Sequence, residues 1–371
     1  MDRVVSRIRT PCPDGGSVTS ICLVMIVRDE SLVLERAIRS VLSLISTWRI
    51  IDTGSIDRTP ELVRELLHDI PGELRTSPWS DFATNRSEVI EWARGSADWL
   101  LLLDADMTIQ TDSDILNRLD GLTAHAALIE VLGDLSYRMP YLVRGDRPWH
   151  YVGRTHEYLS SSQEFRSQNF EALRIAHHAD GGSRSQKFER DLALLRAALA
   201  ETPDDPRTLF YLAQTQRDRG EPEAARQLYR RRAELGGWDE EVFYSRYQQA
   251  LMEDALGLPE ATETLQQAWD IRPVRAEPLY QLARINRLRR RHHLAWIFAT
   301  LAAATPRPED VLFVENWVYH WAARFERADA AWRIGEHELS AELCVELLNE
   351  GHLPDDHREH LEFVLGEVRR S

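Results

Sequence analysis

The sequence predicts an α/β domain with a mixed, mostly parallel sheet, followed by an all-α domain of helical repeats. In about the first hundred residues, short apolar runs alternate with segments of helical spacing. This order is typical of a parallel sheet built from right-handed crossovers. From about Lys187 to the end, the apolar spacing is helical and recurs. We therefore expect a loose tail at residues 1–18, the α/β domain at 19–195 and the helical domain at 196–371.

The elements of the α/β domain follow from the apolar runs and the turn-forming residues between them. Near-continuous apolar or β-branched runs predict strands buried on both faces at 19–27 and 99–103, and shorter strands are expected at 48–51 and 74–76. Apolar residues at helical spacing predict helices at 32–45, 61–67 and from the 79–86 motif to about 93. Further extended segments, which would make the sheet mixed, lie at 126–132, 137–143, 147–160 and 172–178.

The helical half repeats a short pattern. Gly220-Glu-Pro-Glu-Ala224 recurs as Gly257-Leu-Pro-Glu-Ala261, a step of about 37 residues, near the ~34 of tetratricopeptide helix pairs. A third unit covers residues 278–299, and a fainter fourth covers 332–347. Small residues at these offsets let paired helices pack closely, which favours a repeat solenoid over an irregular helical bundle.

The composition excludes several classes of protein. With a net charge of −15 and an isoelectric point near 5.4, the chain has no overall positive field to attract a nucleic acid or an anionic membrane. Its three cysteines are far apart and form no CxxC, which favours a reducing compartment. The apolar runs are too short to span a bilayer, and no apolar signal region follows the N-terminal arginines. We therefore expect a cytoplasmic protein without a membrane span.

Two aspartates follow the most apolar strand of the chain. The run 99–103 leads directly into Asp104-Ala105-Asp106. Carboxylates that follow a parallel strand stand at the sheet edge where open α/β sheets bind their ligands. There they can bind a hard divalent cation, which in turn binds phosphate oxygens. The pattern by itself also allows an Asp-rich turn that ends the strand and caps the next helix.

An ordered set of motifs spans about residues 20–190. It consists of Met25-Ile-Val-Arg-Asp-Glu30, Asp52-Thr-Gly-Ser-Ile-Asp-Arg-Thr59, Trp79-Ser-Asp-Phe82 with Arg86, Asp104-Ala-Asp106, Gly153-Arg-Thr-His-Glu157, and Ile175-Ala-His177 followed by Lys187 and Arg190. With these motifs in this order, the chain resembles a family 2 glycosyltransferase of the GT-A fold with a tetratricopeptide-like C-terminal domain, similar to bacterial peptide glycosyltransferases. One position departs from the family pattern, because Asp29 stands where Asn is more frequent.

The resemblance implies a nucleotide-sugar site. The residues implied as nucleotide contacts are Ile26 and Val27 (backbone against the base), Asp52 (uracil or ribose), Asp81, Arg86, Asp104 (ribose) and Lys187 (phosphate). Arg86 is the better phosphate candidate of its motif, because guanidinium suits bidentate phosphate recognition. Other interpretations stay open: Asp52 as a cap of the helix that begins near Pro60, Arg86 as a solvated helix arginine, and Lys187 as part of a basic surface.

The resemblance also implies a metal ion, Mn²⁺ or Mg²⁺. Asp106 would bind the ion directly, Asp104 would contact the ion or its water, and His177 would complete the protein ligands. Oxygen ligands suit both ions, and a histidine favours Mn²⁺. His178 would point to the opposite face of its strand, so one of the two histidines would face the site. The alternative for His177 is an ordinary packed or solvated strand histidine.

Glu157 is the candidate general base. An inverting transfer needs a carboxylate or a similar group on the acceptor side of the anomeric carbon, opposite the leaving diphosphate. Glu157 follows an aromatic stretch at 149–153 that would form a wall for the sugar or the acceptor. The alternative is that Glu157 pairs with Arg154 at a strand edge.

The expected function is a metal-dependent, inverting transfer of a sugar from a UDP-sugar to a peptide or protein side chain. A glycan or small-molecule hydroxyl is the alternative acceptor, and a nucleotide-sugar-binding scaffold without catalysis is the alternative class. The carboxylates and the histidine described above are all present, which favours the enzyme. A nucleotidyltransferase would need a Gly-rich basic loop after the first strand, where Arg28-Asp-Glu30 stands. The repeats would dock a protein or peptide, and the resemblance alone adds the expectation of a homodimer through them.

Overall fold

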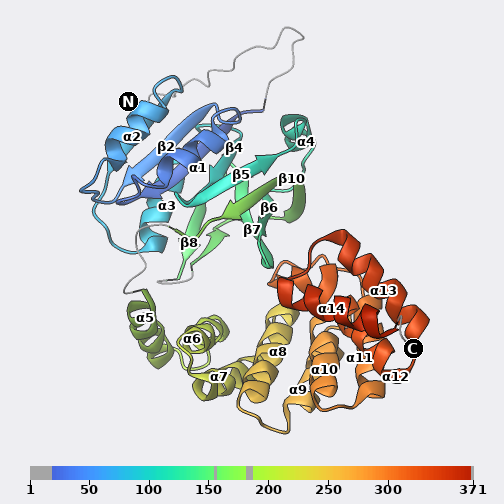
Figure 1. The fold of residues 1–371 in the computed structure, drawn as a ribbon. Helices are drawn as coiled ribbons and strands as arrows, with labels where there is room; N and C mark the ends of the chain where they lie inside the picture. The colour runs from blue at the N-terminus through green and yellow to red at the C-terminus, as the bar shows by residue number, and fades with distance from the viewer. Residues whose placement is uncertain (1–18, 154–156, 181–186, 369–371) are drawn as a thin grey trace, which may run out of the picture. The chain divides into compact units, whose positions relative to one another are not determined.

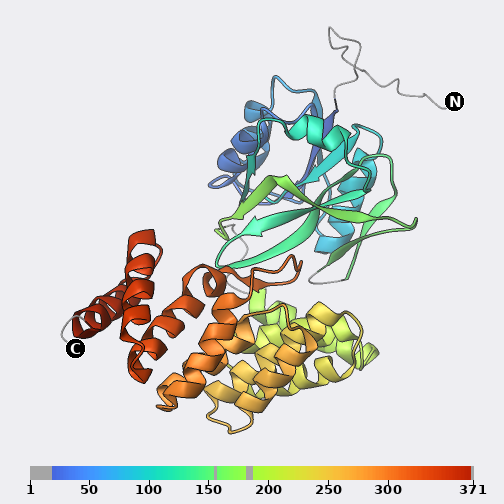
Figure 2. The same ribbon diagram turned by 90° about the vertical axis from the view of Figure 1, so that its right-hand side faces the viewer.

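The computed structural model describes residues 19–153, 157–180 and 187–368, with the backbone alone for 187–191. Its contacts divide the chain into two compact units (Figures 1 and 2). The first contains the residues up to Gly133 and 137–190, and the second contains 134–136 and the residues from Asp191 onward. The fold class predicted from the sequence is confirmed. The domain limit at 195 stays a prediction, and the tail predicted at 1–18 lies outside the described residues.

The first unit is built on a mixed sheet with the strand order β3-β2-β1-β4-β7-β6-β10-β5. Its parallel half consists of β3 (Gly72–Thr76), β2 (Thr47–Asp52), β1 (Ile21–Val27) and β4 (Trp99–Leu102). The other half consists of β7 (Leu135–Arg144), whose first two residues fall in the second unit, β6 (Ala126–Leu132), β10 (Ser167–His177) and β5 (Met107–Thr111). Of the pairs in this half, β6–β10 is parallel and the others are antiparallel. A separate antiparallel hairpin contains β8 (Trp149–Val152) and β9 (Tyr158–Ser161).

Helices cover both faces of the parallel half of the sheet. On one face, Leu23 and Met25 of β1 pack in a core that also contains the buried side of α1 (Leu34–Val41). On the other face, Cys22 and Val24 pack with α3 (Phe82–Ala93). Two further helices, α2 (Thr59–Leu66) and α4 (Ile115–Asp120), bury side chains in the first of these cores. Successive side chains of a strand alternate between faces, so a sheet covered on both faces requires the continuous apolar run of β1.

The second unit is a row of helices joined mostly by short turns (Figure 1). Its first helix is α5 (Lys187–Glu201), whose first four residues fall in the first unit. Four helix pairs follow: α6 (Pro206–Asp218) with α7 (Pro222–Glu234), α8 (Asp239–Ala255) with α9 (Ala261–Ile271), α10 (Glu277–Leu288) with α11 (His292–Ala304), and α12 (Ala323–Ile334) with α13 (His337–Glu350). A π-helical turn, η1 (Val318–Ala322), leads into α12, and α14 (Asp355–Val368) follows the last pair. The four predicted repeat units coincide with these pairs.

Glycine explains why the repeat is visible in the sequence. Gly220 and Gly257 follow α6 and α8 with φ of +77° and +70°, a left-handed conformation that ends a helix and that glycine adopts without steric cost. In the third pair the equivalent position is Arg290, at φ +57°. The third unit therefore lacks the glycine signature although its backbone makes the same turn.

Candidate functional site

The site lies at the carboxyl edge of the parallel strands, where the chain leaves β1, β2 and β4. The loops after β1 and β2 are bonded to each other. The Asp29 N–H donates to Ser55 Oγ at 2.9 Å, and the Ile56 N–H donates to Asp29 Oδ1 at 2.8 Å. Asp29, the departure from the family pattern, therefore fastens one loop to the other. Its φ is +54°, a conformation that Asp and Asn tolerate better than most residues.

Asp57 fastens the same two loops from the other side. Its carboxylate accepts hydrogen bonds from the N–H groups of Ser31 at 3.0 Å and Thr59 at 2.9 Å. Burial would raise the pKa of this carboxyl, but the hydrogen bonds outweigh it and lower the pKa to about 2. Thr59 opens α2, so Asp57 stabilises the start of that helix as well.

Asp52, at the end of β2, is almost completely buried, with 4% of its surface exposed. Its carboxylate accepts hydrogen bonds from the N–H groups of Gly54 at 3.2 Å and Ser55 at 3.1 Å. It therefore shapes its own loop and does not cap α2, which was the alternative interpretation. A contact between Asp52 and a nucleotide stays a prediction.

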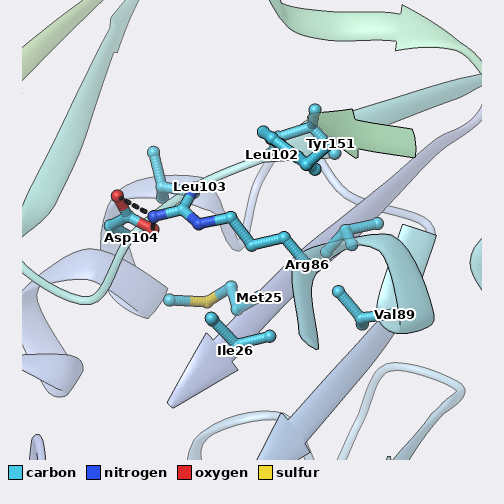
Figure 3. A pocket seen from close by; sticks show the side chains of 9 residues that line it. Met25, Ile26, Arg86, Val89, Leu102, Leu103, Asp104 and Tyr151 are labelled. Carbon is cyan, nitrogen blue, oxygen red and sulfur yellow. Dashed lines mark hydrogen bonds and ion pairs between the residues drawn. The ribbon is translucent and has the colours of Figure 1, made fainter. Parts of the chain in front are cut away.

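A small pocket lies beside this edge (Figure 3). The lining residues are Val24, Met25, Ile26, Arg86, Val89, Leu102, Leu103, Asp104 and Tyr151. Ile26, a predicted base contact, is among them, whereas the neighbouring Val27 is buried in the core of the α1 face. Figure 3 shows the Arg86 side chain extending from α3 across the pocket, with its guanidinium against Asp104.

Arg86 joins two carboxylates that are far apart in the sequence. Its Nη2 lies 2.7 and 2.8 Å from the two oxygens of Asp104, and its Nε lies 3.1 Å from Glu157 Oε1. The three side chains are 20%, 29% and 12% exposed, respectively. Burial alone would lower the Arg86 pKa, but the two carboxylates and Tyr151 hold it well above its usual range. The alternative of a solvated helix arginine is therefore wrong.

The 79–86 motif explains how Arg86 reaches this position. Asp81 caps α3, because its Oδ1 accepts from the Thr84 N–H at 2.9 Å. Asn85 is buried and holds the preceding loop by bonds with the Ser80 N–H at 2.9 Å and the Pro78 carbonyl at 3.1 Å. A nucleotide contact of Asp81 stays a prediction, and the same carboxylate would then serve both the nucleotide and the helix cap. Asn85 was not a predicted site residue, although it stands next to Arg86 in the same motif.

Tyr151 is a further pocket residue that the sequence did not single out. Its N–H donates to Ser87 Oγ on α3 at 2.8 Å, and the centre of its ring lies 5.6 Å from the Arg86 guanidinium carbon. Burial raises the pKa of Tyr151 to about 12. The signal in the sequence was the aromatic stretch directly before Glu157. The suggested partner Arg154 lies outside the described residues, and among the described residues Glu157 forms an ion pair with Arg86.

The two aspartates of the Asp104–Asp106 turn have different partners. Asp104 faces Arg86, whereas Asp106 Oδ2 lies 3.2 Å from His177 Nε2. Strand pairing brings this histidine to the turn, because His177 at the end of β10 stands opposite Met107 at the start of β5. The His178 ring points elsewhere and bonds Thr108 Oγ1 through Nε2 at 2.9 Å.

Asp106 and His177 fit a divalent cation as a pair of ligands. Asp106 Oδ2 and His177 Nε2 face each other, and their side chains are 17% and 33% exposed, respectively. In the part of the chain that the structure describes, no group of three or more His, Cys, Asp or Glu side chains gathers as a metal cage. Ions of this type commonly use one or two protein carboxylates together with substrate phosphates, and the pair leaves positions for those oxygens. Lys187 begins α5, but its side chain lies outside the described part.

Comparison with known proteins agrees with this geometry. Residues 22–184 match the family model described as Glycosyl transferase family 2, and the described part of this range contains the parallel sheet, the Asp104–Asp106 turn and Glu157. These residues form a family 2 glycosyltransferase domain. Within the described ranges, no helix of this chain combines the length and apolar character needed to cross a membrane.

Several known proteins are similar to part of this chain. A TPR repeat-containing protein of Synechococcus elongatus is 29% identical over 210 residues, which cover 52% of this chain and 51% of the relative. The chain thus spans about half the length of that curated relative. Among solved structures, YrrB, described as a TPR protein with an unusual peptide-binding site, matches with a TM-score of 0.38 and 16% identity over 47% of this chain and 81% of its own. MamA matches with a TM-score of 0.37 and 16% identity over 45% of this chain and 88% of its own.

Proposed function

We propose that this chain transfers a sugar from a UDP-sugar to a side chain of a peptide or protein, with inversion at the anomeric carbon. The observation that carries the proposal is the bridge formed by Arg86 between Asp104, on the nucleotide side, and Glu157, the candidate base. The bridge fixes these two carboxylates relative to each other, and Asp106, which pairs with His177 of β10, lies on the same turn as Asp104. A transferase needs this combination, because it must neutralise a leaving diphosphate and deprotonate an acceptor in one site.

The cation has one role in this proposal. Asp106 and His177 would hold Mn²⁺ or Mg²⁺, which when bound would bind the diphosphate oxygens and stabilise the charge that develops as the diphosphate leaves. Asp104, oriented by Arg86, would accept hydrogen bonds from the ribose. Ile26 at the end of β1 would pack against the base, and the loop shaped by Asp52 would border it.

Glu157 would accept the acceptor's proton. The acceptor oxygen or sulfur attacks the anomeric carbon, the bond from that carbon to the diphosphate oxygen breaks, and its electron pair leaves with UDP. The guanidinium of Arg86 holds the Glu157 carboxylate in place for this step. Arg86 is thus a positioning residue in the proposal, since its Nη2 donates to Asp104 and its guanidinium forms an ion pair with Glu157.

The first test is a thermal-shift screen of nucleoside diphosphates and their sugars, with Mn²⁺, with Mg²⁺ and with chelator. A ligand at ~100 times its dissociation constant adds about 2.7 kcal/mol to the free energy of unfolding. We expect a rise with UDP and Mn²⁺ that chelator removes and that Asp106→Ala abolishes, whereas Asp69→Ala, on the surface of the same unit, keeps it. No rise with any nucleotide or nucleotide sugar would refute the proposed donor, and it would count equally against a scaffold that binds nucleotide sugars.

The second test separates catalysis from binding. Glu157→Gln should bind UDP and metal as the wild type does and lose transfer to a hydroxyl acceptor, because the amide cannot accept the proton. The matched control is Glu171→Gln, an exposed position on β10, which should keep full transfer. Normal turnover by Glu157→Gln would place the base elsewhere. Transfer to glycans but not to peptides in the same assay would replace the proposed acceptor class.

A further inference from the structure

The connection between α11 and α12 is longer than the equivalent connections in the helical unit. The turns that join α7 to α8 and α9 to α10 cover residues 235–238 and 272–276, whereas the connection after α11 covers 305–317. It contains a short strand, β11 (Val314–Glu315), which pairs antiparallel with Leu135 and Ser136 of the same unit. We call residues 309–316 the inserted segment.

Side chains of the helical scaffold bind the main chain of the inserted segment. Glu240 of α8 accepts hydrogen bonds through Oε2 from the N–H groups of Val311 at 2.9 Å and Leu312 at 2.8 Å. Arg275, just before α10, donates to the carbonyls of Leu312 at 3.3 Å and Phe313 at 2.7 Å. These contacts bind the main chain of a bent segment, because the backbone bends at Val311 and Leu312 and Phe313 has a φ of +37°.

A second scaffold carboxylate continues this pattern. Glu277, the first residue of α10, accepts from the Glu315 N–H at 3.2 Å and binds the Arg275 guanidinium at 2.7 Å. Arg275 and Glu277 are both completely buried. A buried ion pair is costly to form and to leave incompletely bonded, so these groups are arranged around the main chain that satisfies them.

The scaffold also recognises individual side chains of the inserted segment. The Phe313 ring is stacked on Phe210 of α6, with centroids 6.3 Å apart and planes at 10°, and lies 5.0 Å from the Tyr244 ring of α8. Asp310 is bound by Arg272 through two contacts of 2.6 Å. The surface thus selects an aromatic residue three positions after an aspartate.

The Glu315 carboxylate accepts from the Tyr247 hydroxyl at 3.1 Å, but it lies buried near the Glu277 carboxylate, so the surface does not favour an ionised glutamate at this position. The contacts therefore come from α6, α8 and α10, the first helices of three successive pairs, together with the turn before α10. A solenoid offers this kind of extended surface to a peptide.

We propose that the surface formed by α6, α8 and α10 is a binding site for a bent peptide with the pattern Asp-x-x-Phe, and that the inserted segment is its resident ligand. In the intact chain this surface is closed to other peptides, so a peptide acceptor of the transferase domain would bind elsewhere. The proposal does not depend on the transferase reaction.

Tethering explains why the intact chain would exclude a second copy of the peptide. A segment tied at both ends has an effective concentration of about 1 mM at its site. A free peptide with an intrinsic dissociation constant of about 10 μM would then bind the intact chain about 100-fold more weakly than an emptied site. This difference can be measured directly.

The test uses the full chain with residues 309–315 replaced by seven glycine and serine residues. The probe is a fluorescein-labelled peptide with the sequence of residues 306–316, followed by fluorescence anisotropy. We expect the opened chain to bind the labelled peptide at least 100-fold more tightly than the wild-type chain does. We also expect the opened chain to bind a peptide that carries the Phe313→Ala change at least tenfold more weakly than it binds the unchanged peptide. An opened chain with the circular dichroism of the wild type that binds neither peptide would overturn the proposal.

A single substitution provides the test if the opened chain does not fold. Phe313→Ala in the full chain removes the ring and leaves every backbone contact of the segment in place. The matched control is Phe363→Ala, at a half-exposed position on α14. We expect Phe313→Ala to bind the labelled peptide at least tenfold more tightly than the wild type and the control do. Equal binding by all three chains would show that the segment is only a structural loop.

Discussion

Replacing Arg86 with methionine should destabilise the transferase domain more than its single ion-pair contacts would suggest. The change keeps the length and most of the apolar volume of the side chain, but it leaves Asp104 and Glu157 without their shared cation. Both carboxylates are mostly buried. Breaking a fully buried pair costs about 3–5 kcal/mol, and an exposed pair contributes about 0–1 kcal/mol. We therefore expect a loss of about 3 kcal/mol in the free energy of unfolding at pH 7.

The stability lost by Arg86→Met should depend on pH, and the direction of that dependence follows from the two carboxylates. Without the guanidinium, the folded variant would keep two unpaired carboxylate charges in a mostly buried pocket, which destabilises it wherever both groups are ionised. Protonation removes these charges as pH falls. The deficit of Arg86→Met should therefore be largest at pH 7 and above, and should shrink as pH falls toward 5.

The assay is urea denaturation of wild type and variants at pH 7 and pH 5. Arg94→Met is the matched control: Arg94 follows the same helix and pairs with Glu91 at 2.7 Å, with side chains 43% and 54% exposed, so its loss should stay below about 1 kcal/mol. Adding Glu157→Gln to Arg86→Met should recover part of the lost stability, because one unpaired charge is removed. The reasoning fails if the two arginine variants lose the same stability, or if the Arg86→Met deficit does not change with pH.

Three further predictions follow from particular contacts. Asp57→Ala should lower the free energy of unfolding by about 1–3 kcal/mol at pH 7. The pKa of the Asp57 carboxyl in the folded protein is about 2, so the difference between variant and wild type in urea titrations should vanish as pH falls through 4 toward 2. Gly145→Ala would place a Cβ 2.1 Å from the Ala97 carbonyl oxygen and should lower the melting temperature, whereas Gly121→Ala, with no neighbour closer than 3.8 Å, should not. Burial, with a second carboxylate nearby, raises the pKa of Glu315 to about 7, so Glu315→Gln should unfold at higher urea than the wild type at pH 8 and at the same urea at pH 4. If Asp57→Ala and Glu315→Gln each unfold at the same urea concentration as the wild type at every pH, the pKa shifts given for Asp57 and Glu315 are wrong.

Much of the fold could be predicted because its signals are local. The apolar run of β1 is continuous, and a strand buried on both faces needs such a run. The left-handed turns at Gly220 and Gly257 need a residue without a Cβ, which made the helix pairs visible as a repeat. The elements β5 and α4 were missed, because β5 is short and its pairing partner, β10, comes much later in the chain.

The candidate site was predictable as a set of residues but not as a set of contacts. The Asp104–Asp106 turn could be placed at the sheet edge because it directly follows a buried strand. That Arg86 bridges Asp104 and Glu157 could not be predicted, since the three residues come from α3, the turn after β4 and the segment before β9. The sequence offered Arg86 as a phosphate contact or a surface residue, and the structure shows an internal ion pair.

The sequence by itself determined the kinds of element, their order, and the residue types available at the sheet edge. These depend on side-chain periodicity and backbone preference, which act over a few residues. Only the tertiary structure decided which side chains meet. The pairing of β10 with β5 brings His177, and not His178, to Asp106, and the packing of α6, α8 and α10 makes the surface that binds Phe313 and its neighbours. Such contacts depend on strand register and on the closure of long loops, so no short stretch of sequence specifies them.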